Sequence, residues 1–239
     1  MTVLNGNANT GSDGKSSSIS HILYVLKENP VTLIAFALFG FYVLSAIFGQ
    51  YLVPYDPLAS DSENVLQPPS VKHWFGTDPL GRDVFSRVIS ATRLDLMIAV
   101  SAVAISFVVG SILGSAAGYW GGKLDIILSR TLDTIMAFPI FVLAMGIVAA
   151  LGNTIENIVY ATAIINVPFY ARLVRAEVNI RRNSGFVQSA KLSGNSDLRI
   201  LALQIFPNTL PPMMVQISLN LGWAILNAAG LSFIGLGVR

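Results

Sequence analysis

The sequence predicts an all-α protein that crosses a membrane several times. Apolar residues make up 53% of the 239 residues, charged residues only 12%, and the mean hydropathy is +0.64. A soluble domain carries about twice that share of charge. Most charged residues are bunched at 15–28, 56–95, 123–133 and 172–199, and the gaps between them are long enough to cross a bilayer.

Apolar runs predict five membrane spans. Residues 1–20, rich in Ser, Asn and Gly, predict a disordered cytoplasmic arm, and 21–54 predict an interfacial helix followed by the first span. Residues 55–95 predict a long extracytoplasmic loop, and 96–239 the remaining membrane core. The spans are expected at about 31–53, 96–119, 132–151, 155–173 and 211–234, with a short charged turn over 120–131.

Basic residues predict the orientation. The segment between the fourth and fifth spans has more basic than acidic side chains, and loops with such an excess stay in the cytoplasm. The amino terminus and the 120–131 turn then share that side, and the 55–95 loop faces outward. The basic residues are Arg172, Arg175, Arg181, Arg182, Lys191 and Arg199.

A polar amphipathic segment, 186–212, separates the last two spans. Lys191, Asp197 and Arg199 cannot lie in hydrocarbon, so the segment belongs at one membrane face, where it can meet a soluble partner. Gly194 breaks it and Pro207 closes it, which predicts a helix over about 186–203 before the last span. The plainer interpretation is an ordinary loop between two spans.

A second cluster, the 76–83 turn, lies in the predicted outer loop. Gly76 and Gly81 permit backbone conformations closed to other residues. Asp78, Arg82 and Asp83 are expected to tie the turn together by charged hydrogen bonds. The turn, which reads Gly76-Thr77-Asp78-Pro79-Leu80-Gly81-Arg82-Asp83, fits either a folded plug or a docking surface for an external solute-binding protein.

Polar side chains within the spans gather on the last one. Gln216, Asn220 and Asn227 fall at i, i+4 and i+11 and therefore share one helix face, with Trp223 close by. Asn166 adds another amide from the fourth span. Amides in hydrocarbon need partners, so these side chains either line a water-filled path or bond neighbouring helices.

A stripe of small residues runs along the second span. Gly110, Gly114 and Gly118 recur every four residues, so they share one helix face. Such a stripe lets another helix approach closely, and we expect it to serve packing rather than chemistry.

Several kinds of chemistry are missing from the sequence. It has no cysteine for a thiol nucleophile or metal site, and no Gly-x-x-x-x-Gly-Lys-Ser/Thr loop for ATP. His21 and His73 lie outside the spans, so no hydrolytic site is expected. A metal site from His73, Asp78 and Asp83 is disfavoured by the positive charge of Arg82. The net charge of +2 reflects basic cytoplasmic loops, and nucleic acid is not an expected partner.

Two of these segments resemble one family of membrane proteins. Gln188-Ser189-Ala190, Gly194 and Pro207 are spaced like the "EAA" loop of ABC importer permeases, although Gln188 stands where an acid is usual. The 76–83 turn resembles the Gly-Thr-Asp-x-x-Gly-Arg-Asp signature of the dipeptide, oligopeptide and nickel permease family, on the subunit with the long first outer loop. Similarity to that family runs from about residue 22 to the end.

The resemblance implies a type I ABC importer transmembrane domain in a bacterial inner membrane. Members have six spans, whereas this chain ends at Arg239 after five. The implied partners are a homologous permease subunit, two subunits that bind ATP and magnesium, an extracytoplasmic solute-binding protein and membrane lipid. The chain itself is expected to bind no cofactor and catalyse no reaction. The ATPase is expected to contact Gln188, Ser189, Ala190, Gly194, Asp197, Arg199 and Pro207.

The implied solutes are small peptides or a related solute such as nickel. Relatives often carry an acid where Asn227 stands, so no charge preference is predicted. The alternative function is an ion-driven carrier or passive channel without an ATPase, but the spans lack the buried ionisable residues that ion coupling requires. A membrane-embedded hydrolase would need clustered His, Asp or Ser within the spans.

Overall fold

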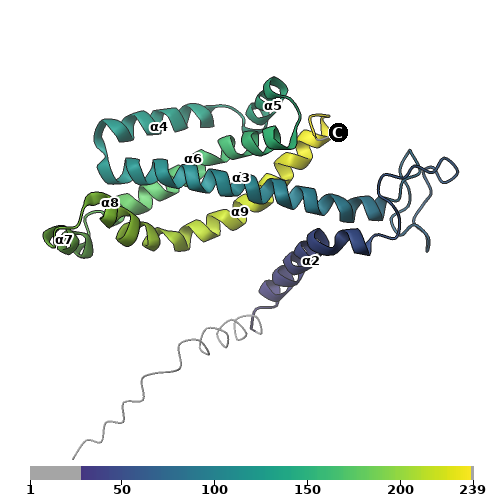
Figure 1. Ribbon diagram of the computed structural model, residues 1–239, viewed down its shortest axis with the longest axis horizontal. Helices are drawn as coiled ribbons and strands as arrows, with labels where there is room; N and C mark the ends of the chain where they lie inside the picture. The colour runs from purple at the N-terminus through teal and green to yellow at the C-terminus, as the bar shows by residue number, and fades with distance from the viewer. Residues whose placement is uncertain (1–27, 238–239) are drawn as a thin grey trace, which may run out of the picture. The chain divides into compact units, whose positions relative to one another are not determined.

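The computed structural model describes residues 28–237, so the predicted arm and the interfacial helix up to residue 27 lie outside the described residues. One compact unit ends at Thr92 and a second begins at Arg93. The described part of the chain contains no strand, only an isolated antiparallel bridge between Thr77 and Asp83. The helices are α2 (Pro30–Leu52), α3 (Val84–Trp120), α4 (Gly122–Ala137), α5 (Ile140–Leu151), α6 (Ile155–Arg181), α7 (Gly185–Leu192), α8 (Asp197–Ile200), the π-helical η1 (Leu201–Ile205) and α9 (Phe206–Phe233) (Figure 1).

Four helices in residues 28–237 are long and apolar enough to cross a membrane: α2, α3, α6 and the continuous helix Asp197–Phe233. The pair α4 and α5 passes the same test together but is bent by 90°, and it makes a fifth span if counted as one. The predicted all-α, multi-span fold class is confirmed.

The first unit contains α2, the outer loop and the first turns of α3. Asn29 caps α2, accepting from the backbone N–H of Val31 and Thr32, and Pro30 occupies the first turn, where its missing N–H costs nothing. Most of the large apolar side chains of α2 are exposed, as suits a helix that faces lipid. One part of α2 is buried: Gly49 packs closely against α3, and a Cβ there would lie 3.0 Å from the Ile89 side chain.

The second span begins earlier than the sequence predicted. Helix α3 starts at Val84, not near residue 96, so the last part of the predicted outer loop is helical. The prediction took Arg87 and Arg93 as loop residues. Arg87 instead donates to the Pro57 carbonyl at 3.2 Å and lies 3.7 Å from Asp78, while Ile89 packs inward.

The predicted bounds and straight course of the third span also differ from the structure. Residues 120–131 are not a short turn, and 132–151 is not one straight span, because α4 and α5 form a sharp corner at Phe138 and Pro139 (Figure 1). Proline has no N–H for the helix ladder and restricts the residue before it, which accounts for the break. The two acidic residues of α4 form ion pairs with α6: Asp125 with Arg175 and Asp133 with Arg172.

Helix α6 is the centre of the second unit, and it runs to Arg181 rather than ending near residue 173. The three glycines of α3 lie against it. A Cβ at Gly110, Gly114 or Gly118 would come within 2.6 Å of Tyr170 Cβ, 2.3 Å of the Ala171 carbonyl oxygen or 2.7 Å of the Arg175 carbonyl oxygen. Only glycine allows this approach of the two backbones, so the stripe packs helices.

Candidate functional site

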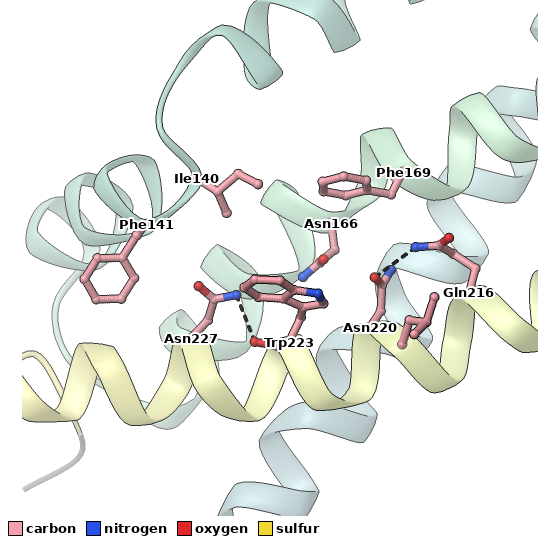
Figure 2. Close-up of a pocket in the computed structure, with 9 residues that line it drawn as sticks. Ile140, Phe141, Asn166, Phe169, Gln216, Asn220, Trp223 and Asn227 are labelled. Carbon is pink, nitrogen blue, oxygen red and sulfur yellow. Dashed lines mark hydrogen bonds between the residues drawn. The ribbon is translucent and has the colours of Figure 1, made fainter.

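A pocket of about 340 Å³ lies between α5, α6 and α9 (Figure 2). It contains four amide side chains and no ionisable one. All five residues predicted on the path lie in it: Asn166 from α6, and Gln216, Asn220, Trp223 and Asn227 from α9. The remaining lining residues are Ile140, Phe141, Phe169 and Leu219. We call this site the amide pocket.

The pocket amides use only part of their hydrogen-bonding capacity within the chain. Gln216 Nε2 donates to Asn220 Oδ1 at 3.0 Å and Asn227 Nδ2 to the Trp223 carbonyl at 2.9 Å (Figure 2). Asn166 Nδ2 donates to the Thr162 carbonyl at 2.7 Å. Asn220 is only 3% exposed; its Nδ2 makes no hydrogen bond of normal geometry, and the side chain interacts with the Tyr170 hydroxyl, which also lacks such a bond. Incomplete hydrogen bonding of buried groups is costly, so a rearrangement of the pocket that gave these groups full partners would be favourable.

Sequence reasoning missed the apolar side chains that α5 and α6 contribute to the pocket. Phe141 and Ile140 enter it from the start of α5, and Phe169 from α6 (Figure 2). Their position depends on the corner at Pro139, so the signal that could have revealed them was a proline inside an apolar run. Phe169 lies three residues after Asn166 and therefore on the same face of α6.

Helices α7 and α8, together the surface segment, take the place of the single predicted 186–203 helix. Gly194 lies in the turn between them with a φ of +78°, a conformation that glycine adopts without strain. Ala190 and Val187 are buried against the core, whereas Gln188, Ser189 and Arg199 are exposed, and Gln188 Nε2 donates to the Asn183 carbonyl. The segment also exposes Phe186, Leu192 and Leu198.

The sequence predicts that Pro207 closes the surface segment, and the structure shows that it does not. The helix runs without interruption from Asp197 to Phe233, and Pro207 lies in the first turn of α9. The π-helical η1 precedes it, and the wider turn of a π-helix offers room for a residue that lacks an N–H. The α8 half of the surface segment is therefore continuous with the helix that supplies most of the amide pocket.

The 76–83 turn is closed by its own polar groups. Asp78 accepts from the backbone N–H of Leu80 and Arg82 and from Arg82 Nε at 2.7 Å. Asp83 accepts from Ser86 and lies 2.9 Å from His73 Nδ1. A Cβ at Gly81 would lie 1.7 Å from the Asp61 carbonyl oxygen.

The carboxylates of this turn are held in their ionised form. Burial opposes the ionisation of Asp83, but hydrogen bonds from Ser86 and His73 outweigh it and lower the pKa of Asp83. Burial likewise opposes ionisation of Asp78, and the N–H groups of Arg82 and Leu80 with the Arg82 guanidinium lower its pKa. Both groups are therefore charged at neutral pH.

His73 is held in the outer loop by contacts with the loop's own residues. His73 pairs with Asp83, and its ring stacks on Tyr55 with the centroids 4.8 Å apart. Within residues 28–237, no group of three or more His, Asp or Glu side chains is placed to hold a metal ion.

A multi-span helical chain with an uncharged polar pocket, joined by one continuous helix to an amphipathic segment outside the spans, has the construction of a membrane transport subunit. The chain belongs to the family of binding-protein-dependent transport system inner membrane components, which matches residues 110–239. The N-terminal transmembrane domain of oligopeptide transport permease C matches residues 18–69. The predicted family is thereby confirmed.

Several relatives are similar over most of this chain. A dipeptide transport system permease of Alkalihalophilus pseudofirmus is 41% identical over 214 residues, 90% of this chain and 70% of the relative. A probable D,D-dipeptide transport system permease of Escherichia coli is 41% identical over 218 residues, 91% of this chain and 73% of the relative. A glutathione transport system permease of Escherichia coli is 40% identical over 198 residues, 82% of this chain and 65% of the relative.

Proposed function

We propose that this chain is a permease subunit through which an ATP-driven importer moves small peptides across the bacterial inner membrane. It is the non-catalytic member of the complex, with its amino terminus in the cytoplasm. It forms the path with a homologous permease subunit. Two ATP-binding subunits hold ATP and magnesium on the cytoplasmic side, and an extracytoplasmic solute-binding protein delivers the solute.

The continuous helix Asp197–Phe233 carries the mechanical part of the proposal. Its first turns belong to the surface segment, and its later turns carry Gln216, Asn220, Trp223 and Asn227 into the amide pocket. A push on the exposed end of a continuous helix moves the residues further along it. ATP hydrolysis in a partner can in this way change the shape of the pocket without any nucleotide site in this chain.

The lining of the amide pocket supports peptides over nickel. A peptide bond presents one N–H donor and one C=O acceptor, and a side-chain amide matches both. Nickel prefers imidazole nitrogens and other strong ligands, and the pocket lining contains no histidine or carboxylate. The relatives named for dipeptide and glutathione transport agree with this choice.

An ion-driven carrier or passive channel has less support. Ion coupling requires an ionisable or ion-binding group on the path, and the pocket lining contains only amides, aromatic rings and aliphatic side chains. The exposed apolar side chains of the surface segment also need a covering partner, which a carrier working alone does not provide.

Reconstitution tests the proposal. The purified complex in liposomes should take up dipeptide only with ATP, magnesium and the solute-binding protein present. Leu192→Asp should release the ATP-binding subunits, because Leu192 is 90% exposed on α7. The matched control is Val71→Asp, which changes a residue 94% exposed in the outer loop and should leave those subunits bound. Uptake driven by an ion gradient alone would overturn the proposal.

A further inference from the structure

Tyr119, one residue before the end of α3, contacts both halves of the surface segment. Its side chain is buried, and its hydroxyl donates to Asp197 Oδ1 of α8 at 2.5 Å. Lys191 Nζ of α7 lies 5.5 Å from the centre of the same ring, within the range of a cation–π contact. One aromatic side chain therefore holds the helices on both sides of Gly194.

The end of α3 is also joined to α6. Arg182, the C-cap residue of α6, donates from Nη1 to the carbonyls of Gly118 and Tyr119 at 3.2 and 3.5 Å. These carbonyls lie in the last turn of α3, where helix carbonyls have no partner within the helix. Four helices, α3, α6, α7 and α8, thus meet at Tyr119.

The packing around Tyr119 is dense and apolar. Val187 and Ala190 from α7, Ile200 from α8 and Val178 from α6 belong to the same buried cluster as Tyr119. Asp197 itself is exposed at the start of α8, so the charge-assisted bond joins the buried tyrosine to the edge of this cluster. The Tyr119–Asp197 bond joins α8 to α3, and the continuous helix joins α8 to α9.

We infer that Tyr119 is a positioning residue that makes α3 follow the movement of the surface segment. The inference rests on the proposed function, since the movement comes from the ATP-binding subunits. Without the bond, force applied at the surface segment still reaches α9 along the continuous helix but reaches α3 only through side-chain packing. The pocket side of the bundle then moves without α3, and ATP is hydrolysed without transport.

Tyr119→Phe tests this inference because it removes the hydroxyl and retains the ring, its packing and its contact with Lys191. In liposomes that contain the complete complex, peptide transported per ATP hydrolysed should fall about tenfold, while assembly and ATP hydrolysis stay near wild type. Asp197→Ala should produce a similar loss from the other side of the bond. The double variant should be no worse than the poorer single variant, since both remove one interaction.

Tyr160→Phe is the matched control, because Tyr160 is 51% exposed on α6 and the variant should couple like wild type. The inference is overturned if assembled Tyr119→Phe complexes couple normally, or if the losses from Tyr119→Phe and Asp197→Ala simply add. It is also overturned if Tyr119→Phe only lowers the amount of complex while each assembled complex transports normally. A wild-type complex without ATP-dependent uptake would instead overturn the proposed function itself, and this inference with it.

Discussion

The 76–83 turn and the amide pocket are both rich in polar groups, but they use them in opposite ways. In the turn, Asp78 and Asp83 each accept several hydrogen bonds from their own loop. In the pocket, the buried Asn220 N–H makes no hydrogen bond of normal geometry within the described part of the chain. A satisfied network fixes one conformation, whereas incompletely bonded amides gain energy when a rearrangement supplies full partners.

This difference suggests a structural role for the 76–83 turn and a transport role for the amide pocket. The turn has the properties of a rigid lip or plug, and its polar residues are occupied with holding it closed. The pocket amides use less of their hydrogen-bonding capacity within the chain, which suits the proposed path. Substitutions in the turn should therefore act on structure, and substitutions in the pocket should act on transport.

The largest effect is expected at Gly81. Alanine there combines a φ of +72° with a Cβ 1.7 Å from the Asp61 carbonyl oxygen, and we expect the turn to lose about 3 kcal/mol or more. Limited proteolysis of the outer loop in membrane vesicles measures the loss. Wild-type protease resistance of Gly81→Ala would show that the turn is not rigid.

The next effect is expected at Asn220. Asn220→Leu removes one hydrogen bond, from Gln216, so unfolding free energy should fall by only about 1 kcal/mol, whereas peptide uptake should fall about tenfold because a polar group of the proposed path is lost. Asn208→Leu is the control on the same helix, since Asn208 is exposed and only bonds the Gln204 carbonyl. Normal uptake by Asn220→Leu, or equal losses in both variants, would show that Asn220 only packs the helices and takes no part in transport.

A smaller effect is expected at Gly194. Its φ of +78° resembles that of Gly81, but a Cβ there would meet no atom within 4 Å. Gly194→Ala should cost only about 1 kcal/mol from backbone strain. Comparing its melting temperature with that of Gly81→Ala separates strain from steric clash. A loss as large as that of Gly81→Ala would mean that Gly194 packs closely against another part of the chain.

The smallest effect is expected from pH in the neutral range. The pKa values of Asp78 and Asp83 are lowered in the folded turn, so their contribution to stability is complete above the unfolded pKa and is lost as the pH falls through the folded pKa. Protease resistance of the turn should stay constant from about pH 8 to 5 and fall below about pH 4. A loss between pH 8 and 6 would show that another group governs the turn.

The sequence predicted elements that depend on local patterns, and it failed where distant contacts decide. The helical spacing of Gln216, Asn220 and Asn227 placed them together, because one helix fixes their relative positions. The sequence predicts a turn over 120–131 because that stretch is charged, whereas α4 is a helix whose Asp125 and Asp133 pair with Arg175 and Arg172, far along the chain. Pro207 was read as a stop because the pattern gives no sign of the π-helical turn before it.

The proposed function requires that α8 and the pocket-lining face of α9 move as one rod. The chain has no cysteine, so labels can be introduced in pairs. One pair joins Leu198 on α8 to Leu226 on α9, and the other joins Leu226 to Val142 on α5; all three side chains are exposed. Pulsed electron paramagnetic resonance in the ATP-bound and nucleotide-free complex should show the first distance unchanged and the second altered. A change within the first pair, with the second constant, would contradict the account.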